Sequence, residues 1–140
     1  MAKDTAVLLE ELKRCSDFNR FYNENSESFP KINLASYLQQ LLEKYSLKKA
    51  DVIRRSELNQ IYAYQIFSGV RIPERKKLLS LAVGMGLSLS EIQNLMKVAG
   101  HAQLYAKDPD DCVVIYGIYK NYSVAQINYM LFDYGMETLG

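Results

Sequence analysis

Hydrophobic residues recur at intervals of three and four along most of the chain, and capping residues separate one run from the next. This spacing is typical of amphipathic helices, because side chains three or four residues apart lie on one helical face. Two short helices are expected before a polar linker that ends at Pro30. Beyond the linker, the pattern predicts helices over Leu34–Tyr45, Lys48–Ser56, Asn59–Ser68, Glu74–Met85 and Ser88–Gly100. About eight helices and no substantial β-structure are expected for the whole chain.

The last part of the chain repeats the helical pattern that precedes it. Moving Lys77–Leu104 forward by 35 residues places Ser88 on Ser123 and Glu91 on Gln126. Ser88 with Glu91, and Ser123 with Gln126, can each form a capping box, in which a serine and a glutamate or glutamine satisfy the first backbone amides of a helix. The repeat therefore predicts a second helical hairpin stacked on the first. Its helices are expected over Asp110–Tyr119 and Val124–Tyr134.

Composition is that of a folded protein: 49% of the 140 residues are hydrophobic, 24% are charged, and there are three prolines. This length suits one ordinary domain. We expect an all-α fold with an N-terminal helical extension (residues 1–30), a central domain (31–100) and a C-terminal helical hairpin packed on it (101–140).

The net charge of +1 hides an uneven distribution of charged residues. From Leu34 to Ala99 there are ten Lys or Arg against five Asp or Glu, whereas the rest of the chain is acidic. A basic middle between acidic ends is expected when one segment meets phosphates. Because charged stretches are usually just solvated surface, the distribution is weak support by itself.

Cysteine usage and hydropathy indicate an intracellular protein. Cys15 and Cys112 are far apart and form no C-x-x-C motif, so neither a zinc site nor a disulfide framework is expected. Buried thiols in a reducing cytosol are the simplest interpretation. No stretch resembles a signal segment or is long enough to span a bilayer, which predicts a cytoplasmic location and no membrane partner.

No residue pattern indicates catalysis. The single histidine, His101, follows a helix-ending glycine and has no cysteine or paired carboxylate nearby in sequence, so we expect a surface or helix-end contact. Asp108, Asp110 and Asp111 stand at a predicted helix start, where capping and the helix dipole explain them better than a bound cation does. We therefore expect no enzyme activity, no metal and no cofactor.

The segment Lys49–Ile66 carries the spacing of a helix-turn-helix. Its fourth, tenth, fifteenth and eighteenth places are apolar, and these residues are Val52, Leu58, Ala63 and Ile66. Two short helices that cross steeply around a tight turn must direct such residues into one small core. The segment resembles the helix-turn-helix of the Cro/repressor-type family, also called XRE-type or lambda-repressor-like. With the helices on either side, the resemblance covers roughly half the chain and implies a lambda-repressor-like bundle.

The segment departs from the family pattern at three points, the first being Lys49 at the first place, where relatives often use glutamine near the DNA backbone. The family's fifth place is usually alanine and is Ile53 here, whereas the fifteenth, usually larger, is Ala63. We interpret this as an exchange of volume across one helix contact. The turn residue is Glu57 in place of the usual glycine, which costs about 1 kcal/mol if its backbone is left-handed, unless the turn is reshaped. The tail, Asp108–Leu139, resembles that of uncharacterised bacterial regulators of this type.

The resemblance implies that Asn59–Ser68 is a recognition helix lying in the major groove of double-stranded DNA. Glutamine can bond adenine at N6 and N7, and isoleucine can contact a thymine methyl. The residues implied as base-reading are Asn59, Gln60, Ile61, Tyr64 and Gln65. Those implied as phosphate contacts are Lys49, Arg71, Arg75, Lys76 and Lys77. All of these except Lys77 are expected on the same face as Gln60 and Gln65.

Two hypotheses follow for function. The first is a sequence-specific DNA-binding transcriptional regulator, with homodimerisation suggested by the paired half-sites that family members commonly read. The alternative is a non-catalytic protein-interaction module, antitoxin-like or an adaptor, that holds a protein partner through the aromatic recognition helix or the C-terminal hairpin. We expect the aromatic stripe of that hairpin to be mainly core, with a surplus of tyrosine for an interface. The stripe consists of Tyr116, Tyr119, Tyr122, Tyr129, Phe132 and Tyr134.

Overall fold

A computed structural model describes residues 3–28 and 33–140, and every regular element in these two ranges is helical. The all-α class is therefore confirmed for the described residues. The chain divides into two compact units, Met1–Ile32 and Asn33–Gly140, so residues 101–140 share a unit with the region before them. In the same two ranges, no helix has the length and apolar character needed to cross a membrane.

The first unit contains α1 (Thr5–Arg14), α2 (Phe18–Glu24) and a short 3-10 helix, η1 (Ser26–Ser28). Asp4 and Asp17 cap the two α-helices through their side chains. The expected linker is thus helical as far as Ser28, and Pro30 lies outside the described residues.

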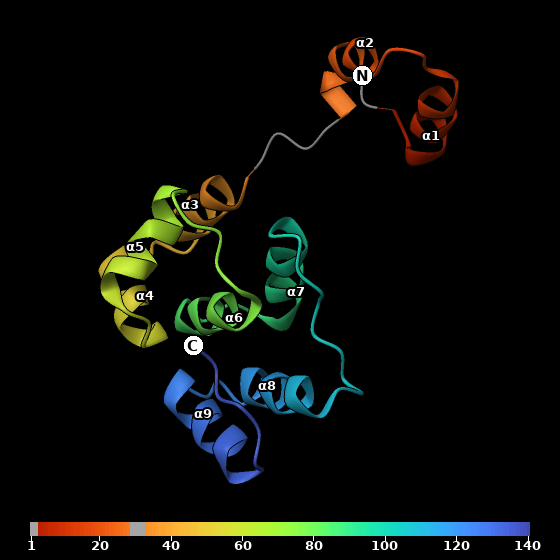
Figure 1. The fold of residues 1–140 in the computed structure, drawn as a ribbon. Helices are drawn as coiled ribbons and strands as arrows, with labels where there is room; N and C mark the ends of the chain where they lie inside the picture. Colours follow the sequence, from red (N-terminus) through yellow and green to blue (C-terminus); the bar gives the residue numbers. More distant parts are fainter. Residues whose placement is uncertain (1–2, 29–32) are drawn as a thin grey trace. The chain divides into compact units, whose positions relative to one another are not determined.

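The second unit is built around one central helix, α6. Leu78, Leu79 and Leu81 of this helix are almost completely buried, because α4, α7 and α9 all pack against it (Figure 1). A helix that is apolar on every side is expected only inside a core. The helices of this unit are α3 (Leu34–Lys44), α4 (Lys49–Ser56), α5 (Gln60–Ser68), α6 (Arg75–Gly84), α7 (Leu89–Val98), α8 (Pro109–Tyr119) and α9 (Val124–Asp133).

The backbones of α4 and α6 approach each other directly at Gly84. A Cβ at this glycine would lie 2.8 Å from the Ser56 nitrogen and 2.9 Å from the Val52 oxygen. Both neighbours are backbone atoms, which cannot rotate away as a side chain can. Gly84 therefore fixes how closely α4 sits against the centre of the unit.

The apolar positions of the α4–α5 segment converge as the spacing predicts. Val52, Ala63 and Ile66 are fully buried in one core, and Leu58 is partly buried against it. Glu57 has φ 60°, so the turn keeps the left-handed backbone and is not reshaped.

The 35-residue repeat is visible in the capping of α7 and α9. Ser88 and Glu91 form a complete capping box at the start of α7, and Ser123 and Gln126 form one at the start of α9. The predicted stacking is also present, since α8 packs on α7 and α9 packs on α6.

In each hairpin, a side chain of the second helix also forms a hydrogen bond to the backbone of the segment that follows. The side chain of Gln93 accepts a hydrogen bond from the Leu104 amide at 2.7 Å, and Asn128 accepts one from the Leu139 amide at 2.7 Å. These two hydrogen bonds are again 35 residues apart in the sequence, and each holds the backbone of a buried leucine. The second hairpin is therefore a structural copy of the first.

The expectation that the aromatic stripe is mainly core is wrong. Of its six residues only Tyr122 is half-buried, and the other five are exposed, Phe132 to 77%. The hairpin buries Val114, Ile127 and Leu131 towards α6, and no other helix of the Asn33–Gly140 unit covers its other side. The cysteines also differ from expectation, because Cys112 is exposed and Cys15 is only partly covered.

Candidate nucleic-acid interface

The ends of α5 are fixed by local hydrogen bonds. The side-chain oxygen of Asn59 accepts a hydrogen bond from the Tyr62 amide at 3.0 Å, which caps the helix start. Gly69 ends the helix in the left-handed conformation, with φ 85°. The amides of Val70 and Arg71 then bond back to the Gln65 carbonyl, at 3.1 and 3.2 Å. The helix and the loop after it are therefore held as one element.

One face of α5 is open. Consecutive residues in an α-helix are about 100° apart, so Gln60, Ile61 and Tyr64 share a face opposite the buried Ala63 and Ile66. The three are exposed, Ile61 to 70%. None of their side chains forms a hydrogen bond to another residue in the described part of the chain. These groups are therefore free to meet a partner.

Cationic side chains flank this open face on both edges. Tyr62 and Phe67 border the face on opposite sides of the helix. The guanidinium of Arg71 and the ammonium of Lys77 each lie 5.1 Å from the Tyr62 ring centre, and Lys49 lies 5.3 Å from that of Phe67. Such contacts contribute only about 0.5–1 kcal/mol at exposed sites, so the cations stay available to anions. The structure thus brings together three of the five predicted phosphate contacts.

Two of the predicted base-reading residues are already engaged. The side-chain oxygen of Asn59 serves the helix cap, and that of Gln65 accepts a hydrogen bond from the Arg71 Nε at 3.0 Å. A bidentate contact with adenine needs both the oxygen and the nitrogen of an amide. Of the three predicted amide side chains, Gln60 is therefore the one with both atoms free.

Arg75 is predicted to contact phosphate, but its side chain is already paired within the fold. Its guanidinium forms a bidentate pair with Asp111, at 3.0 and 2.8 Å, and also donates to the carbonyls of Ala102 and Gln103. The hydrogen bond to Asp111, more than any other factor, raises the pKa of Arg75 above its ordinary value. This residue holds α6, the connector after α7 and α8 together.

Lys76, like Arg75, pairs with a carboxylate from the C-terminal part of the chain. Its ammonium pairs with the Glu137 carboxylate near the C-terminus, and not with any group of α5. Arg75 and Lys76 are expected on the same face as Gln60, but both are paired with groups outside α5.

The remaining residues singled out from the sequence have structural partners. Asp108 caps α8 by accepting hydrogen bonds from the amides of Asp110 and Asp111, as predicted. The half-buried His101 ring contacts the Pro73 carbonyl at 2.8 Å. Across the described ranges, no group of three or more His, Cys, Asp or Glu is placed to hold a metal ion.

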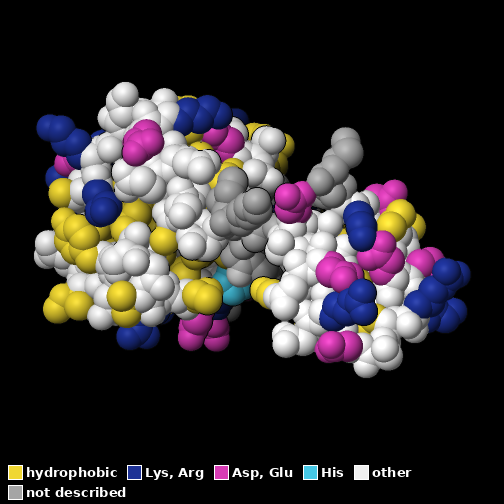
Figure 2. Space-filling view, turned by 90° about the horizontal axis from the view of Figure 1, so that it is seen from above, with side chains coloured by type: hydrophobic (Ala, Val, Ile, Leu, Met, Phe, Trp, Pro, Cys, Tyr) yellow, Lys and Arg dark blue, Asp and Glu magenta, His cyan; other side chains and the backbone are white. Residues whose placement is uncertain are grey.

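The loop after α5 carries exposed apolar residues that the sequence analysis missed. Val70 and Ile72 are each 76% exposed. Figure 2 shows a face of the Asn33–Gly140 unit on which hydrophobic side chains gather, with Lys and Arg around them. In the sequence both residues stand between Gly69 and Pro73, outside the predicted helices.

The α5 surface can bind a large, shaped partner better than it can enclose a small molecule. It offers one free amide, two exposed apolar or aromatic groups and cations on both edges. Comparisons of the chain with protein-family models, with curated proteins and with solved structures give no match. The function is therefore argued from the α5 surface itself.

Proposed function

We propose that this chain is a sequence-specific, double-stranded DNA-binding transcriptional regulator with a lambda-repressor-like helix-turn-helix. In this proposal α4 and α5 form the helix-turn-helix, and α5 is the recognition helix. The observation that carries it is the open face of α5, which lies between cations on both of its edges. Readers of the major groove need this combination, because phosphates flank the exposed base edges on each side.

Each group on this surface has a definite role in the proposal. Gln60 bonds adenine through its free amide, and Ile61 contacts a thymine methyl. Lys49 on one edge, and Arg71 and Lys77 on the other, bind phosphates. A helix of nine residues reads few base pairs, so two copies of the chain on paired half-sites fit this role.

Binding of the purified chain to a random duplex library, measured over a range of salt concentrations, tests the proposal. Replacing Lys77 with Gln should weaken binding to all sequences and lower the salt slope by about one unit. Replacing Gln60 with Ala should instead change the preference between sequences, by about 1–3 kcal/mol at one position. Lys120→Gln, at the end of α8, is the charge-matched control and should leave both properties unchanged.

A second candidate, the protein-interaction module, is favoured by the exposed aromatic residues. Tyr129 and Phe132 are 73% and 77% exposed on α9. Exposed aromatic side chains are enriched at the centres of protein interfaces. If the Lys77 and Gln60 variants leave DNA binding unchanged, and Tyr64→Ala abolishes association with a protein partner, this function is the better one.

A further inference from the structure

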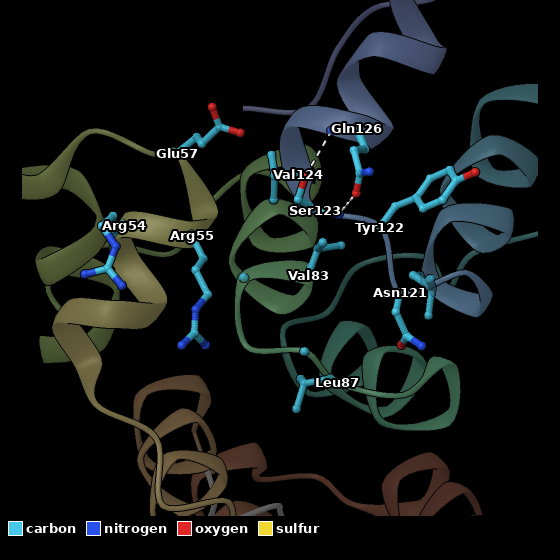
Figure 3. Close-up of a pocket in the computed structure, with 13 residues that line it drawn as sticks. Arg54, Arg55, Glu57, Val83, Leu87, Asn121, Tyr122, Ser123, Val124 and Gln126 are labelled. Carbon is cyan, nitrogen blue, oxygen red and sulfur yellow. Dashed lines mark hydrogen bonds between the residues drawn. The ribbon is translucent and has the colours of Figure 1, made fainter.

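A groove of about 530 Å³ opens beside α4, and its lining includes no residue of α5. Its walls are α4, the end of α6 and the turn that joins α8 to α9 (Figure 3). This volume lies in the range in which proteins hold small organic ligands. Buried and half-buried apolar side chains form the lining between the walls, and they are Val83, Leu87, Ile118, Tyr122 and Val124.

One guanidinium in this groove is unpaired. Arg55 extends from α4 towards Leu87 in Figure 3, and its side chain has no ion-pair or hydrogen-bond partner in the described part of the chain. Arg54 differs, because it is paired with Asp51 at 3.1 Å and points away from the other labelled side chains. Glu57 leaves the turn after α4 in the opposite direction from Arg55. Arg55 is therefore the cation that a ligand in the groove can reach.

The start of α9 adds positive potential to the same groove. Its capping box occupies the amides of Ser123 and Gln126 and leaves the amides of Val124 and Ala125 without acceptors inside the helix. These amides and the helix dipole favour an anion. The corresponding box of α7 contains the carboxylate of Glu91, whereas the neutral Gln126 stands here. The capping box of α9 therefore adds no negative charge to the groove.

We propose that this groove binds a small organic anion with an apolar body. The anionic group pairs with Arg55, and the apolar body covers Val83, Leu87 and Ile118. Because Glu57 stands at the rim, a ligand with a single negative charge fits better than one with several. No groove residue belongs to α5, so the site goes beyond the proposed DNA binding and can be tested without DNA.

The probe is 8-anilinonaphthalene-1-sulfonate, which joins an aromatic body to one sulfonate and fluoresces in apolar sites. Titration into the purified chain should show one saturable site. Replacing Arg55 with Met should weaken binding about five- to tenfold, as expected for the loss of one charge-assisted hydrogen bond. Arg54→Met removes an equal charge from the same helix and should change the affinity less than twofold. The uncharged N-phenyl-1-naphthylamine should bind wild type and Arg55→Met equally.

Amide chemical shifts locate the probe independently of its affinity. They should change around Val83, Leu87 and Val124. The proposal is overturned if the probe does not bind, if Arg55→Met and Arg54→Met bind it equally, or if the shifts gather around Tyr129 and Phe132. Thermal unfolding of both arginine variants should match that of wild type, since both side chains are exposed.

Discussion

The role of Arg75 as a structural residue, and not a DNA contact, gives the sharpest test of the structure. Replacing Arg75 with Met removes two hydrogen bonds to Asp111 and those to the carbonyls of Ala102 and Gln103. The Asp111 carboxylate, whose side chain is 8% exposed, keeps one donor from elsewhere in the fold, the Tyr105 amide. An uncompensated buried charge costs about 3–5 kcal/mol. Because the Arg75 side chain is 30% exposed, we expect a smaller loss, about 2–3 kcal/mol.

A double-mutant cycle separates the pair from the other contacts. Asp111→Asn keeps the shape and the acceptor for Tyr105 and should cost about 2 kcal/mol. In the double variant no charge is left unpaired, so its loss should fall short of the sum by about 1–2 kcal/mol. The chain has no tryptophan, so urea unfolding is best followed by circular dichroism. A coupling below about 0.5 kcal/mol would refute the reasoning.

A comparison of Arg75→Met with Arg71→Met distinguishes a structural arginine from a DNA-binding one. Under conditions in which each variant is folded, Arg75→Met should leave the salt slope of DNA binding unchanged, whereas Arg71→Met should lower it by about one unit. A drop of one unit for Arg75→Met would show that the pair with Asp111 opens on DNA.

Three further predictions concern stability. Glu57→Gly should raise the free energy of unfolding by up to about 1 kcal/mol, because glycine tolerates φ 60°; Glu57→Ala keeps the strain and should give no such gain in urea unfolding. Gly84→Ala should cost about 1–3 kcal/mol despite the better helix propensity of alanine, and an unchanged urea midpoint would mean that α4 and α6 move apart freely. For Glu91, burial raises the pKa, but hydrogen bonds from Tyr45 and Ser88 outweigh it and leave the pKa below 4.5. The ionised Glu91 therefore contributes fully to the stability of the fold above its unfolded-state pKa of 4.5, and this contribution is lost as the pH falls through the lower folded-state pKa. Glu91→Gln should therefore reduce the loss of thermal stability between about pH 5 and pH 3. An identical pH dependence in the two proteins would contradict this.

Features that depend on nearby residues could be predicted from the sequence. The caps by Ser88 and Asp108 are present as expected, because each side chain accepts a hydrogen bond from an amide two or three residues further on. The hairpin repeat is equally local, since serine caps and leucine spacing mark it before any tertiary contact forms. The backbone of Glu57 was open between a left-handed and a reshaped turn in the sequence, and the structure has the left-handed one.

The errors concern contacts between residues far apart in the chain. Arg75 and Lys76 are chemically suited to phosphate, but their partners Asp111 and Glu137 lie 36 and 61 residues away. No pattern around the lysine or arginine indicates those carboxylates. The exposure of Phe132 is similar, because it depends on whether another layer covers α9, which helical periodicity does not encode.

The repeat also explains why the tyrosines of α8 can remain in water. Moving Leu81 and Gly84 of α6 forward by 35 residues gives Tyr116 and Tyr119. On α6 this face receives α4, and Gly84 lets the two backbones meet. On α8 the ring of Tyr119 occupies the place where another backbone would have to lie, and its hydroxyl can be hydrated. No helix can therefore pack on this face of α8 as closely as α4 packs on α6.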